Sequence, residues 1–162
     1  CCGVSGWTIY SCLALGFASA LVAGVFQAFS DFVMAGLARA RPAGGIESMQ
    51  QLNRTVMRSV FLATFLALVP LTVGFAIYGF TTLSGPARVL VIAASALYIM
   101  SVFLATVFGN VPMNNALDAL AHDSDAARDY WARYTRRWTR WNHVRTLGAA
   151  ATSALYLLTV TQ

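Results

Sequence analysis

Residues 59–110 read SVFLATFLALVPLTVGFAIYGFTTLSGPARVLVIAASALYIMSVFLATVFGN, and Arg88 is the one charged residue among them. A helix needs about 20 apolar residues to cross a hydrocarbon core about 30 Å thick. The stretch is long enough for two such helices, and Ser84, Gly85 and Pro86 supply a tight turn between them. Its apolar runs are continuous rather than alternating, so membrane-spanning helices are predicted.

Two further uncharged runs begin at Trp7 and at Thr146. With 58% hydrophobic and 10% charged residues, the 162-residue chain has too few charges to cover a water-soluble globule of its size. The sequence therefore predicts an all-α fold, a four-transmembrane-helix bundle that forms a single integral membrane domain over residues 1–162. The predicted spans cover residues 7–31, 56–82, 88–111 and 142–162.

The basic residues predict the orientation of these spans. All eleven are arginine, and ten lie in or beside two connections, between spans one and two and between spans three and four. Because basic residues gather on the cytoplasmic side, these connections are predicted to be cytoplasmic, with both termini outside, in a bacterial inner membrane. Topology thus explains the net charge of +5. No nucleic-acid partner is expected, because the arginines are not interleaved on a soluble module.

Two local patterns predict how the helices pack and begin. Small residues recur every four positions in the first span and favour close approach of a neighbouring helix, at Gly16, Ala20, Gly24 and Ala28. Asp123 or Ser124 can cap a cytoplasmic interfacial helix that precedes the fourth span. Whether the chain forms an oligomer stays open.

Polar residues gather at four predicted helix ends on the cytoplasmic side. Such residues are costly in a bilayer unless they are paired, hydrated or functional. We expect the following residues to line or buttress one pocket: Gln27 and Asp31 in span one, Asn53 and Arg54 in span two, Asn110 and Asn114 in span three, and Asn142, His143 and Arg145 in span four. A structural clasp, with Asp31 paired to Arg54 or Arg145, is the alternative.

Helical phase orients two of these side chains. At about 100° per residue, Asp31 and Gln27 fall in the sector of Gly24 and Ala20, so Asp31 is expected to face the bundle. His143 shares a helix face with threonines one turn away on either side and is expected to point inward.

Aromatic residues and possible metal ligands complete the candidates. Trp138 and Trp141 suit an interfacial aromatic belt, or they stack against an aromatic ligand. One histidine, one acid and several amides do not make a zinc or di-iron set, although haem held by His143, or another metal, stays open. Cys1, Cys2 and Cys12 all lie near the amino end, so they cannot tie distant parts of the chain together.

Four stretches together resemble the anthrone oxygenase-like family: GVFQAFSDFVMAGLAR (24–39), MQQLNR (49–54), FGNVPMNNAL (108–117) and WARYTRRWTRWNHVRT (131–146). The resemblance covers nearly the whole chain. It implies a small four-helix membrane protein that oxidises an anthrone to an anthraquinone with dioxygen, and hence a monooxygenase acting on a hydrophobic aromatic substrate.

The residues permit this chemistry without a cofactor. A base must remove the ring-methylene proton, after which the electron-rich enolate can pass an electron to dioxygen. His143, oriented by Asp31 or Asn142, is the candidate base. Arg54 or Arg145 would stabilise the enolate oxygen. The substrate would be positioned and enclosed by Asn53, Asn110, Asn114, Gln27, Phe29, Phe32, Phe108, Trp138 and Trp141.

A second reading assigns no reaction to the same residues. The polar cluster would then be a structural clasp, or a site for a lipid, another small molecule, haem or a metal, in a non-enzymatic membrane protein. Oxygen uptake on addition of an anthrone distinguishes the two readings.

Overall fold

A computed structural model describes residues 4–162, which form helices and contain no strand. The predicted all-α fold is confirmed, whereas Cys1 and Cys2 lie outside the described residues. The elements are α1 (Gly6–Ala28), η1 (Phe29–Val33), α2 (Met34–Arg39), α3 (Pro42–Val56), α4 (Val60–Thr82), α5 (Gly85–Leu97), η2 (Tyr98–Asn110), α6 (Val111–Asp118) and α7 (Asp125–Thr159), where η marks wide π-helical turns.

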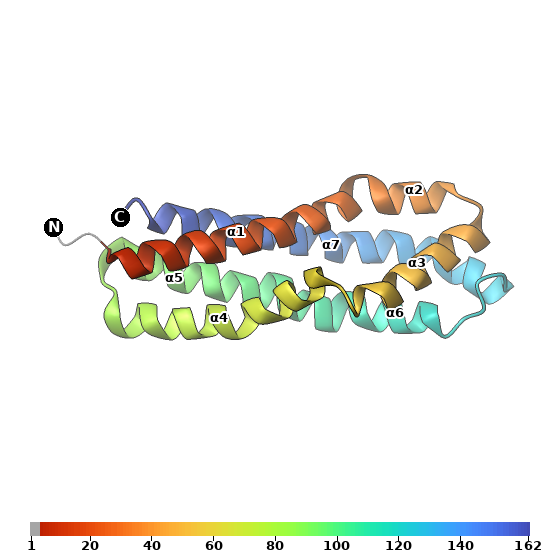
Figure 1. Cartoon of the computed structure of the whole chain (residues 1–162). Helices are drawn as coiled ribbons and strands as arrows, with labels where there is room; N and C mark the ends of the chain where they lie inside the picture. Colours follow the sequence, from red (N-terminus) through yellow and green to blue (C-terminus); the bar gives the residue numbers. More distant parts are fainter. Residues whose placement is uncertain (1–3) are drawn as a thin grey trace.

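Four lengths of chain lie side by side along one long axis (Figure 1). The first length consists of α1, η1 and α2, and the second of α3 and α4. The third consists of α5, η2 and α6, and the fourth is α7 alone. Both described ends of the chain lie beside the α4–α5 turn, and the two arginine-rich connections meet at the opposite end. This is the relative arrangement that the positions of the arginines predicted.

Three helices of the described chain are long and apolar enough to cross a membrane: Gly6–Arg39, Val60–Thr82 and Gly85–Asp118. This finding supports an integral membrane protein. The predicted fourth span, residues 142–162, is not among the three. It belongs to α7, whose uncharged stretch begins only at Thr146 and ends with the helix at Thr159, which is short for a crossing. It stays a prediction. The predicted interfacial helix and this span are continuous in α7.

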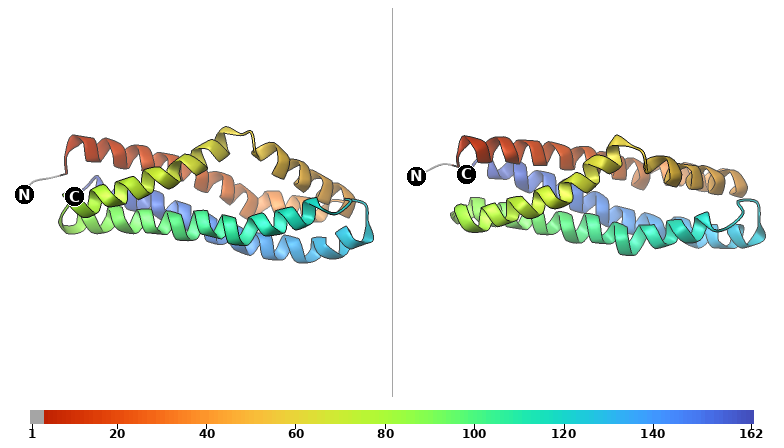
Figure 2. Two further views of the ribbon diagram at one scale, coloured as in Figure 1. Left: turned by 90° about the horizontal axis from the view of Figure 1, so that it is seen from below. Right: turned by 60° about the horizontal axis from the view of Figure 1, so that its bottom comes forward.

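Serine caps and one glycine set the helix ends. Ser59 Oγ accepts a hydrogen bond from Leu62 N at 3.1 Å, and Ser124 Oγ accepts one from Ala127 N at 3.1 Å. Each satisfies an N–H group that the first turn leaves without a partner. Gly85 has φ +59° in the α4–α5 turn, a conformation that favours glycine. The α3–α4 break, residues 57–59, projects from the side of the molecule (Figure 2).

The interior has two separate apolar clusters. The membrane core packs α1, α4, α5, η2 and α7 together around Phe26, Phe65, Val91, Tyr98 and Tyr156. The arginine-end core packs α2, α3, α6 and the first half of α7 together around Met34, Ile46, Met49, Leu117, Trp131, Tyr134 and Trp138. At about 1.5 Å per residue, α7 is ~50 Å long and passes through both cores.

The prediction that α1 packs along its stripe of small residues is wrong. Gly16 lies against Leu157 of α7, but Ala20 and Gly24 are exposed. Four-residue steps advance 400° around a helix, so such a stripe drifts by 40° at each step. The buried face instead follows spacings of three and four residues through Cys12, Leu15, Gly16, Ser19, Val22, Ala23 and Phe26.

The wide turn η1 changes which residues of the first length face inward. Phe26 and Met34 are both buried, although they are eight residues apart and would differ by about 80° on a regular α-helix. The π-helical turn absorbs about one residue and returns Met34 to the inner face. The residues of the turn itself are half-buried or exposed.

Candidate functional site

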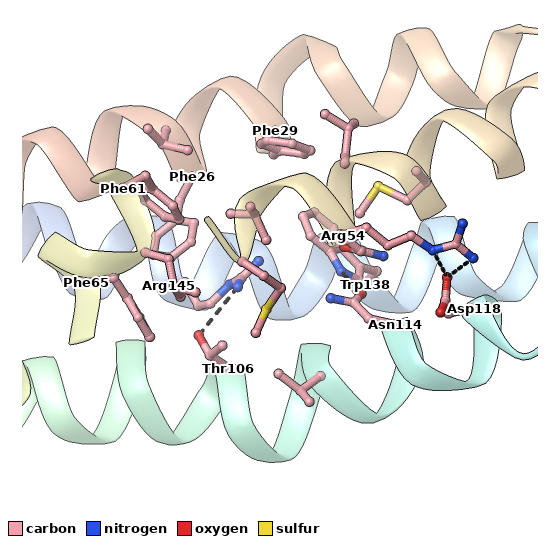
Figure 3. Close-up of a pocket in the computed structure, with 18 of the residues that line it drawn as sticks. Phe26, Phe29, Arg54, Phe61, Phe65, Thr106, Asn114, Asp118, Trp138 and Arg145 are labelled. Carbon is pink, nitrogen blue, oxygen red and sulfur yellow. Dashed lines mark hydrogen bonds and ion pairs between the residues drawn. The ribbon is translucent and has the colours of Figure 1, made fainter. Parts of the chain in front are cut away.

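A cavity of about 380 Å³ lies between the two cores, within the size range of small-molecule sites. Aromatic residues from both cores supply its apolar wall: Phe26, Phe29, Phe61, Phe65 and Trp138. The polar residues that line it are Asn53, Arg54, Thr106, Asn114, Asn115, Asp118 and Arg145. Figure 3 shows Arg145 near one end of this set and the Arg54–Asp118 pair at the other.

Arg145 places a buried cation in the cavity, with only 6% of the residue exposed. Its Nη2 donates to Asn142 Oδ1 at 2.6 Å, and Nη1 donates to Thr106 Oγ1 at 3.4 Å. Within the described chain it has no carboxylate partner, and its Nε has no hydrogen-bond partner. A buried unpaired charge costs several kcal/mol, so this environment favours a ligand oxygen that carries negative charge.

Two aromatic rings hold the guanidinium from its sides. Its Cζ atom lies 4.3 Å from the centroid of the Phe26 ring and 5.1 Å from that of Trp138. Cation–π contacts of this kind partly replace the lost hydration of the charge. These contacts use the faces of the guanidinium and provide no acceptor for its Nε–H group.

Asn142 positions Arg145 relative to α1. Its Nδ2 donates to Phe26 O at 2.6 Å and to Ser30 Oγ at 2.7 Å, while Oδ1 accepts from Arg145. Asn142 is fully buried. One amide therefore ties α7 to α1 and η1 and fixes the direction of the guanidinium.

Two asparagines offer further N–H donors. Asn114 Oδ1 accepts hydrogen bonds from Tyr134 Oη at 2.9 Å and Trp138 Nε1 at 2.8 Å, which leaves its NH2 group for a ligand. Burial raises the pKa of Tyr134 above its usual range, so this hydroxyl stays protonated and donates. The buried Nδ2 of Asn53 has no partner among the described residues. Both amides line the cavity.

An ion pair lies at the far end of the cavity from Arg145. Arg54 Nη2 and Nε lie 2.8 Å and 3.0 Å from Asp118 Oδ1, and both side chains are about half exposed. The pair joins the end of α3 to the end of α6. Arg54 thus has a counter-charge, unlike Arg145.

The structure brings many of the predicted site residues together, although their roles stay predictions. Those that line the cavity are Phe29, Asn53, Arg54, Asn114, Trp138 and Arg145. Asn142 does not line the cavity but holds Arg145 in place through a hydrogen bond. Asn110 is also buried and donates to Trp138 O at 3.2 Å, so it holds one wall residue in place.

Asp31 and Gln27 lie elsewhere, and the expectation that Asp31 faces the bundle is wrong. Both side chains are exposed, and Asp31 forms no ion pair with Arg54 or Arg145. The helical phase argument did place them on one face with Gly24. That face is the outer one, because the small-residue stripe is not the packing surface.

His143 also differs from its expected orientation. Its side chain is exposed and lines a second, open groove formed by η1, α2 and α7. Asn142 and Arg145 occupy the inner face of α7, and His143 lies about 100° from Asn142 on that helix. The structure therefore separates His143 from the Arg145 cavity.

Three predicted aromatic walls also lie outside the cavity lining. Phe32 and Phe108 are 64% and 73% exposed, as befits lipid-facing side chains of apolar helices. Trp141 is partly exposed and packs over Gly109, where a β-carbon would lie 2.5 Å from its ring. The interfacial-belt reading suits Trp141 better than ligand stacking.

Sequence reasoning missed several residues of the cavity. Phe61 and Phe65 lie one helical turn apart just after the polar start of span two, and this signal was available in the sequence. Phe26 and Thr106 could not be identified without the helix register. Asp118 is not among the site residues that the sequence predicted.

No group of three or more His, Cys, Asp or Glu side chains close enough to hold a metal ion occurs among residues 4–162. The cavity's own polar groups are amides, arginines, a threonine hydroxyl and one carboxylate.

The chain matches the model of one protein family, described as anthrone oxygenase, over residues 47–155. The match covers about two thirds of the chain, including the greater part of α3, all of α4, α5, η2 and α6, and most of α7. Neither a curated protein nor a solved structure matches the chain.

Proposed function

Because the chain belongs to the anthrone oxygenase family, we propose that it is a membrane oxidoreductase that binds an anthrone-like aromatic molecule in the cavity between its two cores and oxidises it with dioxygen. The observation that carries this proposal is Arg145, a buried cation in an aromatic-walled cavity with no carboxylate partner in the part of the chain that the structure describes.

The unfilled hydrogen-bonding groups of the cavity support an oxygen-bearing ligand. Three of these groups are donors: Arg145 Nε, Asn53 Nδ2 and the NH2 of Asn114. A flat aromatic ketone offers apolar faces to the phenylalanines and acceptor oxygens to these donors. Its enolate adds negative charge at the oxygen next to Arg145, which is where stabilisation would lower the barrier.

The reaction balances with dioxygen alone. Loss of one methylene proton gives the enolate, which transfers an electron to dioxygen, and the resulting radical and superoxide combine at the methylene carbon. The protonated peroxide then loses water across its remaining C–H bond. One oxygen atom becomes the new carbonyl of the anthraquinone, and the other leaves as water.

Asp118 is the proposed proton acceptor, because it is the carboxylate among the cavity's lining residues. The methylene carbon and the carbonyl oxygen of an anthrone lie at opposite edges of the central ring. With the oxygen at Arg145, the methylene group would be directed toward the Arg54–Asp118 pair, which lies at the other end of the cavity in Figure 3. His143 lines another groove, so the proposal gives it no step.

The test is oxygen consumption and anthraquinone absorbance with the full chain, purified in detergent, and hydroxylated anthrones as substrates. We expect uptake above the spontaneous rate, and about 10²-fold less with Arg145→Lys, which keeps a charge but loses the planar donor edge. The control is Arg137→Gln on the exposed side of α7. Absence of uptake with the native chain would overturn the reaction.

A structural clasp is the second candidate, and one hydrogen-bond chain favours it. Arg145, Asn142, Ser30 and Thr146 are linked in sequence, with Ser30 Oγ and Thr146 Oγ1 3.1 Å apart. These bonds join η1 to α7, and the bond from Asn142 to the Phe26 carbonyl adds α1. If Arg145→Lys mainly lowers the unfolding temperature, and the native chain binds no anthrone, the clasp is the function of the cluster.

The proposal includes four membrane crossings. The second half of α7 lies beside α1 and α5 in the membrane core and would be the fourth span. Helices about 50 Å long exceed a hydrocarbon core of about 30 Å. The arginine-end core would therefore project on the cytoplasmic side, with the cavity near the boundary.

A further inference from the structure

A second groove, of about 340 Å³, runs along the outer side of α7 where α7 meets η1 and α2. Small side chains, Ala35 and Ala38, leave room on one wall, and α7 supplies the other. The cavity described above opens elsewhere, since the two share no lining residue.

The α7 wall of this groove is cationic. Arg136, Arg140 and His143 follow one another at spacings of four and three residues and therefore lie on one helix face. Neither arginine forms an ion pair with another described residue, and no acidic residue lines the groove. The nearby hydroxyls of Thr135 and Thr139 already donate to backbone carbonyls. The free donors are thus the guanidinium groups and the imidazole.

The same face of α7 becomes apolar beyond His143. Leu147, one turn further, is 70% exposed, and the exposed face continues through Ala151 and Ala154 to Leu158, which is 52% exposed. The face is therefore cationic in its first half and apolar in its second half. A free anion would use only the first half, whereas an amphiphile would cover both.

We propose that this face of α7 binds one anionic phospholipid, with its phosphate between Arg136 and Arg140 in the groove and an acyl chain along Leu147 to Leu158. Arginine matches phosphate in geometry as well as charge. Basic residues beside a membrane helix attract anionic lipid on the cytoplasmic side. The inference does not depend on the proposed reaction.

The experiment measures lipid retained by the full chain, purified in a nonionic detergent, with native mass spectrometry and thermal unfolding. Phosphatidylglycerol and phosphatidylcholine with identical acyl chains are compared with inorganic phosphate. We expect one phosphatidylglycerol bound at least about ten-fold more tightly than phosphatidylcholine, and an affinity about 30-fold lower in Arg136→Gln/Arg140→Gln, at roughly five-fold per lost contact.

The matched control is Arg133→Gln/Arg137→Gln, which removes the same charge from exposed positions of α7 outside the groove. It should keep the affinity of the native chain. Ala35→Leu/Ala38→Leu fills the groove without changing charge and should weaken binding. Equal loss in both arginine pairs, equal affinity for phosphatidylcholine, or full stabilisation by inorganic phosphate would each overturn the proposal.

Discussion

The guanidinium of Arg145 lies 4.3 Å from the ring of Phe26, and Asn142 bonds both to this guanidinium and to the backbone oxygen of Phe26. An aromatic ring and an amide thus hold a buried cation against α1, while no acid of the described residues 4–162 pairs with it. The arrangement fixes the charge in position before any ligand arrives. Preorganised charge of this kind needs no rearrangement during a reaction.

Replacing Asn142 should weaken the fold as well as the site. In Asn142→Ala the Phe26 carbonyl and the guanidinium lose buried partners, and we expect a loss of about 2–4 kcal/mol in the free energy of unfolding. Denaturant unfolding in detergent, followed by tryptophan fluorescence, measures it. His143→Ala, at the adjacent exposed position, is the control and should change stability little. Similar losses in both variants would contradict the role of Asn142.

Variants of Asp118 and His143 distinguish two candidate sites of proton removal. We expect Asp118→Asn to reduce oxygen-dependent turnover by about 10²-fold, as for loss of a general base. His143→Ala should stay within about two-fold of the native chain, because its side chain lies outside the cavity. Steady-state oxygen uptake decides. The reverse result would move the reaction to the groove on the outer side of α7.

Gly148 lets α7 approach η2 closely. A β-carbon there would overlap Ser101, so Gly148→Ala should destabilise the protein by about 1–3 kcal/mol. Gly74→Ala, in a membrane helix with open space around it, is the matched control and should be neutral or slightly stabilising. Thermal unfolding of both variants in the same detergent provides the comparison, and equal unfolding temperatures would refute tight packing at Gly148.

Cysteine labelling tests the orientation in intact bacterial cells. In a chain without its own cysteines, Gly44→Cys and Ala126→Cys should be shielded from a membrane-impermeant reagent, because the arginine-rich connections are predicted to be cytoplasmic. Ser84→Cys, in the exposed α4–α5 turn, should be labelled. Labelling of the first two and protection of the third would reverse the orientation.

The fold was readable from the sequence wherever composition alone decides it. Uncharged runs predict helices and their approximate number, and arginine positions predict which connections lie together. The sequence did not predict which residues of each helix face inward, because this depends on the exact rotation of the helix. Regular helical geometry does not reveal the π-helical turn of η1, and so the inward position of Met34 could not be obtained.

The candidate site was predicted only in part, because its residues also depend on which face of each helix points inward. Polar helix ends identified Asn53, Asn114 and Arg145, since such residues must cluster in a membrane protein whichever face they occupy. Choosing between His143 and Arg145 as the inward residue required knowing which side of α7 packs on α1. The four-residue repeat of small residues on α1 indicated the wrong side, because the buried face of α1 follows spacings of three and four residues.

The interruption at residues 57–59 divides one side of the bundle between the two cores. The other three lengths of chain run from one core to the other as continuous helix. In the divided length, α3 packs in the arginine-end core and α4 packs in the membrane core, and the two helices take different directions (Figure 2). The Arg54–Asp118 pair joins the end of α3 to α6 just before the interruption. Each core is therefore completed on this side by a helix of its own.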